Sequence, residues 1–175
     1  MAILGVDDFK SKLVGGGARP NLFKATVNFP AYAGGEVELT SFMIKAAQLP
    51  ASVVGTVVVP FRGRQLKIAG DRTFYPWTIT VINDTDFKVR NAFERWMNGI
   101  NQHRNNTGLT NPIDYQADMQ VAQLDKAGNE VKVYNFRSAF PTAVSAIELS
   151  YDSVDVIEEF QVELQVQYWE SDTTS

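Results

Sequence analysis

Apolar and polar residues alternate along much of the chain. In segment 23–29 the odd positions are apolar and the even positions polar, and segments 77–81 and 115–121 repeat the pattern. The most regular run is 160–168, where Phe, Val, Leu, Val and Tyr alternate with Gln, Glu, Gln and Gln. Such alternation is typical of half-buried strands, because successive side chains point to opposite faces of a sheet. We predict shorter strands near 37–45, 53–59, 65–68, 131–136 and 143–149.

One segment follows a helical spacing instead. Its apolar positions are separated by steps of three and one, which draws a single helical face; they are Val89, Ala92, Phe93, Trp96, Met97 and Ile100. The preceding residues 83–85 supply candidate caps, and Asp86 suits the positive end of a first helical turn. The pattern predicts a helix between residues 85 and 101, followed by an exposed, Asn-rich loop over 99–112.

Together these elements predict a mainly β fold, a β-sandwich or barrel with one packed α-helix. The seven prolines lie at strand margins, where a missing N–H does least harm to a ladder, and residues 125–130 are typical of a hairpin turn. A chain of 175 residues supports one core, so we predict a single β-barrel domain over residues 20–170. Residues 1–19 are predicted to be a flexible arm, with a short helix and a joint at 15–17, and residues 171–175 a polar tail.

Composition narrows the possible chemistry. The chain has no cysteine, and its single histidine, His103, cannot supply the paired imidazoles of most zinc or non-haem iron sites. We therefore expect no metal and no cofactor.

The net charge is −4, whereas proteins that bind nucleic acid tightly normally have an excess of basic residues. No run approaches the roughly 18 apolar residues of a membrane span, and Asp7 and Asp8 stand where a secretory signal needs a basic start. We expect a protein without a membrane partner, made in a cytoplasm.

The reactive side chains form no pattern that predicts catalysis. His103 lies in the polar loop and is interpreted as a solvated surface residue. Paired carboxylates can run hydrolysis when they are held a few ångströms apart, but capping explains Asp84 with Asp86, and strand-edge charge explains Glu158 with Glu159. The glycines at 15–17 lack the lysine and hydroxyl residue of a phosphate-binding loop. We predict a structural protein and not an enzyme.

Two rows of polar residues and one basic cluster stand out. The rows are Gln161, Glu163, Gln165 and Gln167, and Gln116, Asp118 and Gln120. Each is either an ordinary solvent-facing side of a sheet or a wall past which something charged slides. The basic cluster joins Arg62 and Arg64 to the nearby Lys67 and Arg72, and it forms either ion pairs at a subunit interface or a solvated edge.

Several short sequence blocks, together with their order and spacing along the chain, are informative. They are 18–23 (ARPNLF), 45–51 (KAAQLPA), 69–74 (AGDRTF) leading into 77–81, Asn83-Asp84 before the helix, Phe93 and Trp96 within it, and the closing Tyr168-Trp169-Glu170. By these blocks the chain resembles the tail tube proteins of phages with contractile tails. The resemblance covers residues 18–170, nearly the whole chain.

The resemblance implies an assembly, a set of partners and a location. Subunits of that family close into hexameric rings, which stack helically into a hollow tube inside a contractile sheath. Their strands join to line one inner barrel, through which DNA passes during ejection without tight binding. The expected partners are further copies of the chain, the sheath protein, the baseplate and the tape-measure protein. The expected location is the virion, after assembly in the host cytoplasm.

The family picture assigns roles to particular residues. We expect one polar row, preferably Gln161-Glu163-Gln165-Gln167, to face the channel, since an acidic, hydrogen-bonding wall does not retain phosphate; the second candidate row is Gln116, Asp118 and Gln120. We expect the core, where helix meets sheet, to contain Trp77, Phe93 and Trp96. The candidate subunit-interface residues are Arg62, Arg64, Asp71 and Arg72.

Two other functions remain open at this point. A tube subunit of a bacterial contractile injection or secretion apparatus shares the fold and the assembly and differs in cargo. A monomeric β-barrel that binds a small ligand in its interior predicts a stable monomer and a pocket lined by Trp and Tyr.

Overall fold

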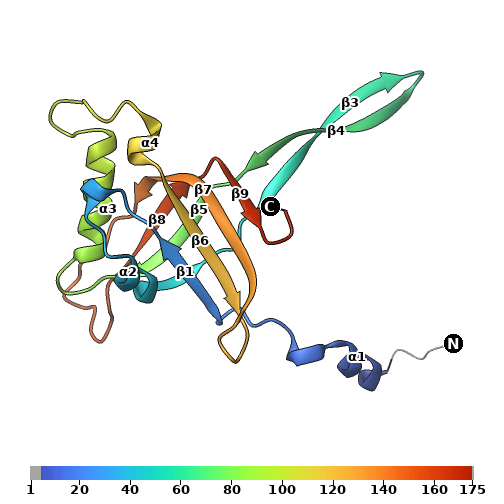
Figure 1. Ribbon diagram of the computed structural model, residues 1–175, viewed down its shortest axis with the longest axis horizontal. Helices are drawn as coiled ribbons and strands as arrows, with labels where there is room; N and C mark the ends of the chain where they lie inside the picture. Colours follow the sequence, from blue (N-terminus) through green and yellow to red (C-terminus); the bar gives the residue numbers. More distant parts are fainter. Residues whose placement is uncertain (1–4, 175) are drawn as a thin grey trace.

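The fold is a barrel-like body from which two segments project (Figure 1). This computed structural model describes residues 5–174, so residues 1–4 of the predicted arm and residue 175 of the predicted tail lie outside the described residues. The helices are α1 (Val6–Lys12), α2 (Val37–Met43), α3 (Lys88–Ile100) and α4 (Pro112–Tyr115), with short 3₁₀ turns at Val14–Gly16 and Ala31–Ala33. The strands are β1 (Phe23–Val27), β2 (Ile44–Ala47), β3 (Ser52–Phe61), β4 (Arg64–Phe74), β5 (Trp77–Ile82), β6 (Ala117–Leu124), β7 (Glu130–Val144), β8 (Glu159–Gln165) and β9 (Tyr168–Ser171).

Seven strands form the body, and strand β7 links its two halves. The order is β1-β6-β7-β8-β5-β2, with β9 also paired to β7, and every pairing is antiparallel. Residues 134–137 of β7 pair with β9, while residues 140–144 pair with β8. Between them Ser138 has a left-handed backbone (φ 53°), where the β6 register also shifts. A bulge of this kind bends a strand, so β7 carries the sheet around a corner and the two halves enclose a core.

Alternate residues of both halves fill that core. In β5 and β8 every second side chain is buried, as the alternation predicted. Trp77 of β5 stacks on Phe136 of β7 with ring centroids 4.5 Å apart, and its Nε1 donates to the Gln48 carbonyl at 2.7 Å. The body interior is therefore packed with side chains, unlike that of a barrel that holds a ligand.

Helix α3 packs against the body through its apolar face. Val89, Ala92, Phe93 and Trp96 are all buried. Phe29, after β1, meets both Phe93 and Trp96 edge-on, at centroid distances of 5.1 and 5.7 Å. The Trp96 Nε1 donates to the Tyr115 carbonyl at 2.7 Å, which ties α3 to α4. Phe93 and Trp96 thus lie where the helix meets the body, while Trp77 is buried on β5 against Phe136.

Three predicted boundaries are wrong. Segment 37–43 is helix α2 and not a strand, because Leu39 and Met43, one turn apart, both pack on the core. The strand predicted over 143–149 ends at Val144, and an irregular loop follows. Helix α3 starts at Lys88, after Phe87 in a left-handed conformation, so Asp86 precedes it.

The capping prediction holds in part. The Asp84 Oδ1 accepts the Lys88 backbone N–H at 3.1 Å, so a carboxylate before the helix does bind its first turn. The turn predicted over 125–130 joins β6 to β7. Its Asp125 carboxylate accepts the N–H groups of Ala127 and Asn129, both at 2.8 Å. Those hydrogen bonds lower the pKa of Asp125, and the one from the Asn129 N–H has the largest effect.

Candidate assembly surfaces

The outward side of β8 carries a continuous polar surface. Gln161, Glu163 and Gln165 alternate with buried residues, so all three point away from the core. In register beside them on β5 lie Thr80, opposite Gln161, and Thr78, opposite Glu163. We call these five residues the β5–β8 face. It has hydroxyl and amide groups, one carboxylate and no cation.

The strands that flank the β5–β8 face leave two edges open. On one side β2 pairs only with β5, and on the other residues 140–144 of β7 pair only with β8, within residues 5–174. Lys45 of β2 lies beside this face, and it pairs with Glu159. Open edges carry unpaired N–H and C=O groups that invite a further strand.

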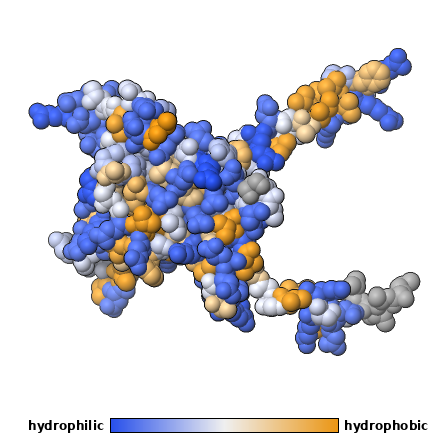
Figure 2. Space-filling view, in the orientation of Figure 1, coloured by the Kyte–Doolittle hydropathy of each residue, from blue (hydrophilic) through white to orange (hydrophobic). Residues whose placement is uncertain are grey.

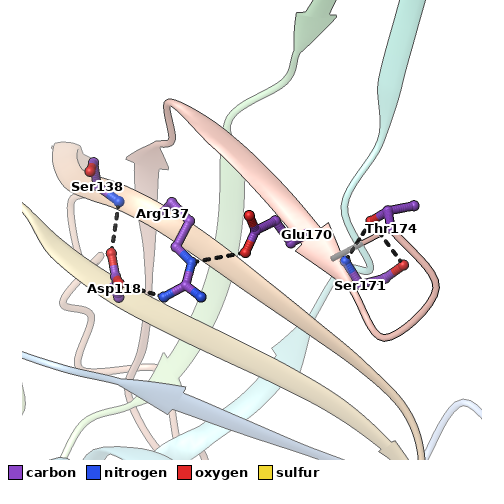
Figure 3. A network of polar contacts seen from close by, with 6 residues as sticks. All are labelled: Asp118, Arg137, Ser138, Glu170, Ser171 and Thr174. Atoms are coloured by element: carbon purple, nitrogen blue, oxygen red, sulfur yellow. Dashed lines mark hydrogen bonds and ion pairs between the residues drawn. The ribbon is translucent and has the colours of Figure 1, made fainter.

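The second polar row lies on the other half of the body and carries mixed charge. Arg137 Nη1 binds Asp118 at 2.8 Å and its Nε binds Glu170 at 3.2 Å, across strands β6, β7 and β9 (Figure 3). The Ser138 N–H donates to the same Asp118 at 2.9 Å. Partial burial raises the pKa of Asp118, but the hydrogen bonds from Ser138 and Arg137 and the charge of Arg137 outweigh it and lower that pKa. The hydrogen bond that Arg137 donates to Asp118 in turn raises the pKa of Arg137. These ion pairs and hydrogen bonds link strands β6, β7 and β9.

Neither predicted row is complete. Gln116 is the C-cap of α4 and precedes β6, because α4 takes up residue 115, the first residue of the strand expected over 115–121. Gln167 lies between β8 and β9, and its N–H donates to the Arg137 carbonyl at 3.2 Å. There the chain crosses from one half of the body to the other, which ends the row at Gln165. Gln120 lies on β6 opposite Asn135 and is half-buried.

The candidate interface residues all lie on a projecting hairpin. Strands β3 and β4 pair with each other and extend away from the body (Figure 1). Arg62 and Arg64 lie at its tip, while Asp71 and Arg72 lie near its base; all four are exposed. Arg62 and Gly63 form the turn with positive φ angles of 45° and 81°, the geometry of a type I′ turn.

Sequence reasoning missed how apolar this hairpin is. Large apolar side chains are exposed on both of its faces, and Figure 2 shows them as an orange stretch along the arm; they are Val53, Val54, Val57, Val58, Val59, Phe61, Leu66 and Ile68. The signal was the unbroken run 57–59, since a strand with one buried face would alternate. An isolated two-stranded ribbon is marginal in water at best, so this segment fits a role in which another surface covers it.

The loop from Ser145 to Glu158 is a second surface that the sequence did not reveal. Its base is fixed: the Ser145 Oγ accepts the Gln161 N–H at 2.8 Å, and the Asn83 Nδ2 donates to Glu158 at 2.9 Å. Beyond the base the loop exposes large apolar side chains, which are Leu149, Tyr151, Val154, Val156 and Ile157. Carboxylates are interspersed among them, and no lysine or arginine occurs after Arg137 in the sequence.

Other kinds of site find little support. Among the described residues no three His, Cys, Asp or Glu side chains gather as a metal site would require. Over that same part of the chain, no helix is long and apolar enough to cross a membrane. His103 is exposed in the loop after α3, as interpreted from the sequence.

Comparison with known proteins decides the family. The family model described as "Phage tail tube protein" matches residues 18–172. The chain belongs to the phage tail tube protein family. It is a structural subunit of the phage tail and so a component of the virion, as the resemblance implied. Among curated relatives, tail tube protein gp19 of Enterobacteria phage T4 is 34% identical over 154 residues, which is 87% of this chain and 91% of that protein. The tail tube protein of Serratia phage KSP90 is 28% identical over 91% of this chain and 93% of its own length.

Solved structures confirm the tube fold. The anti-feeding prophage cap, described as a tube terminating cap, matches with a TM-score of 0.67 and 18% identity, over 91% of this chain and 92% of the other. A sheath-tube complex of an extracellular contractile injection system in the extended state matches with a TM-score of 0.63 and 15% identity, over 93% and 96%. At these identities the likeness concerns the fold alone.

Proposed function

We propose that copies of this subunit close into hexameric rings and stack into a hollow tube, with the β5–β8 face lining the channel. The observation that carries this proposal is the chemistry of that face. Its threonines, glutamines and single carboxylate can hydrogen-bond water, and the cation beside it, Lys45 of β2, is paired with Glu159. Because DNA affinity comes mainly from phosphate neutralisation, such a wall lets DNA slide past without adhesion.

The other polar face suits a channel less well. Arg137 lies at its centre, and Lys24 adds a second cation on β1. Although Asp118 and Glu170 neutralise Arg137, every ring would still present guanidinium groups to passing DNA. Hence the row on β8 is the better channel wall.

Ring closure has a ready route in the sheet. The open edges of β2 and of residues 140–144 of β7 lie on opposite sides of the β5–β8 face. If β2 of one subunit pairs with β7 of the next, four strands from each copy join into one continuous inner barrel. Contacts between two different surfaces generate closed rings when the rotation between copies is fixed. Sixfold symmetry is in keeping with the 6-fold symmetrised baseplate of the anti-feeding prophage, which has the same fold at a TM-score of 0.64.

The tube would work inside a contractile tail. The matched cap and sheath-tube structures contain tubes with a terminating cap and a sheath. By analogy, the partners of this chain are the sheath protein, the baseplate and the tape-measure protein that occupies the channel before DNA. The tube is then a passive conduit for DNA ejection, and no catalytic step is required of it. The identity of 34% to a phage protein favours the phage tail over a bacterial injection apparatus.

Electron microscopy of the purified protein at rising concentration, with light scattering, tests the proposal. We expect hollow rings or tubes with sixfold symmetry, either spontaneously or after seeding with baseplates. A sample that stays monomeric even with baseplates would contradict it.

A further inference from the structure

The tip of the projecting hairpin combines an exposed apolar side chain with cations. Phe61 is 66% exposed, and Arg62 and Arg64 flank the turn beside it. The hairpin, residues 52–74, contains four cations and one carboxylate. Within residues 5–174, none of those cations forms an ion pair; they are Arg62, Arg64, Lys67 and Arg72.

The loop 145–158 presents the complementary surface. A pocket of about 440 Å³ lies under it; the lining is made of four apolar residues, two serines and three carboxylates, which are Ile147, Leu149, Val156, Ile157, Ser150, Ser153, Glu148, Glu158 and Glu159. The segment has four carboxylates and no cation. Among the described residues, none of the four forms an ion pair with a cation; they are Glu148, Asp152, Asp155 and Glu158. A hollow that combines apolar side chains with carboxylates therefore matches a tip that combines an apolar side chain with cations.

The two surfaces lie at opposite ends of the molecule. In Figure 1 the hairpin extends to the upper right, whereas the loop between β7 and β8 lies at the lower left, below α3. The longest axis of the molecule is horizontal in that view, so the hairpin cannot reach the loop of its own chain. Two complementary surfaces at opposite ends of one chain make a head-to-tail contact, which repeats from copy to copy.

We propose that the hairpin tip of one subunit docks into the pocket under loop 145–158 of a second copy. Phe61 contacts the apolar side chains of the hollow, and Arg62 and Arg64 pair with its carboxylates. Ten residues of β3 extend roughly 33 Å, enough for the contact to bridge to a neighbour without the two bodies touching. This inference rests on the proposed self-assembly and names the surface that receives the hairpin.

Cysteine crosslinking gives the most direct test, because the chain has no cysteine of its own. Tubes are assembled from an equimolar mixture of Phe61→Cys and Leu149→Cys subunits and then oxidised. We expect a disulfide-linked dimer on a non-reducing gel. In the matched control, Ile113→Cys replaces Leu149→Cys; Ile113 is 81% exposed but lies in α4, and its mixture should stay uncrosslinked.

Charge reversal supplies a second, independent arm. Arg62→Glu/Arg64→Glu and Glu148→Arg/Asp152→Arg should each assemble at least tenfold more slowly by light scattering than the unchanged protein. A mixture of the two variants should recover assembly, since each reversed hairpin then meets a reversed loop. Arg104→Glu/Lys126→Glu makes the same net change as the hairpin variant at exposed positions elsewhere and should assemble normally.

The outcomes separate this inference from the proposed function. Tubes that form normally from the hairpin variant, or that crosslink Phe61→Cys to Ile113→Cys as readily as to Leu149→Cys, would overturn the docking and leave the tube intact. Crosslinking of Phe61→Cys to Phe42→Cys in α2 instead would place the hairpin in the groove beside β1 and overturn it equally. Failure of the unchanged protein to assemble under any condition would overturn both.

Discussion

Replacing Trp96 by alanine should destabilise the body more than most single substitutions. The side chain is fully buried, contacts Phe29 and Phe93, and donates a hydrogen bond to the Tyr115 carbonyl. Truncating a buried tryptophan to alanine costs about 3–5 kcal/mol, because apolar contacts are lost and a cavity remains. Domains of this kind are stable by about 5–15 kcal/mol, so the variant should lose about a fifth of its stability or more.

A second substitution separates the hydrogen bond from the volume. Trp96→Phe keeps much of the ring but leaves the Tyr115 carbonyl without its donor at 2.7 Å. An unsatisfied buried group costs about 1–3 kcal/mol, so this variant should fall between Trp96→Ala and the unchanged protein. At roughly 2–4 °C per kcal/mol for a domain of this size, Trp96→Ala should melt about 6–20 °C lower.

Urea unfolding followed by circular dichroism measures the effect, at concentrations where light scattering shows no assembly. The slope of free energy against urea should stay constant, so that the midpoint shift reports stability. Phe42→Ala is the matched control, since Phe42 is 78% exposed in α2 and should change stability by no more than about 0.5 kcal/mol. A loss below about 1 kcal/mol for Trp96→Ala would refute its place in a tightly packed core.

Three further predictions concern charge. Glu163→Lys should leave tube formation intact but reduce infectivity sharply in plaque assays, because each lysine in the channel adds a binding site for DNA phosphate. The control Asp114→Lys, at an exposed position of α4, should leave infectivity unchanged. Equal infectivity of the two variants would contradict the assignment of Glu163 to the channel wall. The pKa of Asp118 is lowered in the fold, so its contribution to stability is present above about pH 4 and is lost as the pH falls through the folded value. In Asp118→Asn the urea midpoint should therefore decline less as the pH is lowered than it does in the unchanged protein. Equal declines in the two proteins would refute a stabilising role of the Asp118–Arg137 network. Asp84→Ala should cost about 1 kcal/mol as a lost cap, whereas Asp86→Ala, exposed before the helix, should cost almost nothing.

Local pattern predicted the elements that bury one face. Alternation identified β1, β5, β6 and β8, and the three-and-one spacing identified α3, because in these segments burial itself sets the period. The same reliance on alternation produced the wrong prediction of a strand over 37–43. Val37 and Leu39 alternate with polar residues as a strand would, but the helix is decided by packing of Leu39 and Met43 on the core and by the hydrogen bond from the Thr40 hydroxyl to the Glu36 carbonyl.

The assembly surfaces were harder to predict because they depend on what the strands pair with. Segments 53–59 and 65–68 were identified as strands, yet nothing local shows that β3 and β4 pair only with each other and leave the body. The polar row on β8 could be placed on one face, whereas the crossing at Gln167 is set by the turn from one half of the sheet to the other. The loop 145–158 was missed because its first residues alternate like a strand, although its acidic and apolar residues lack a regular period.

A helical reconstruction of the assembled tube by cryo-electron microscopy, at a resolution that shows side chains, would identify the strands that line the channel. We expect the side chains of Thr78, Thr80, Gln161, Glu163 and Gln165 to point toward the tube axis, with β2 of one subunit paired to residues 140–144 of its neighbour. A channel lined instead by Asp118, Arg137 and Glu170 would contradict this expectation.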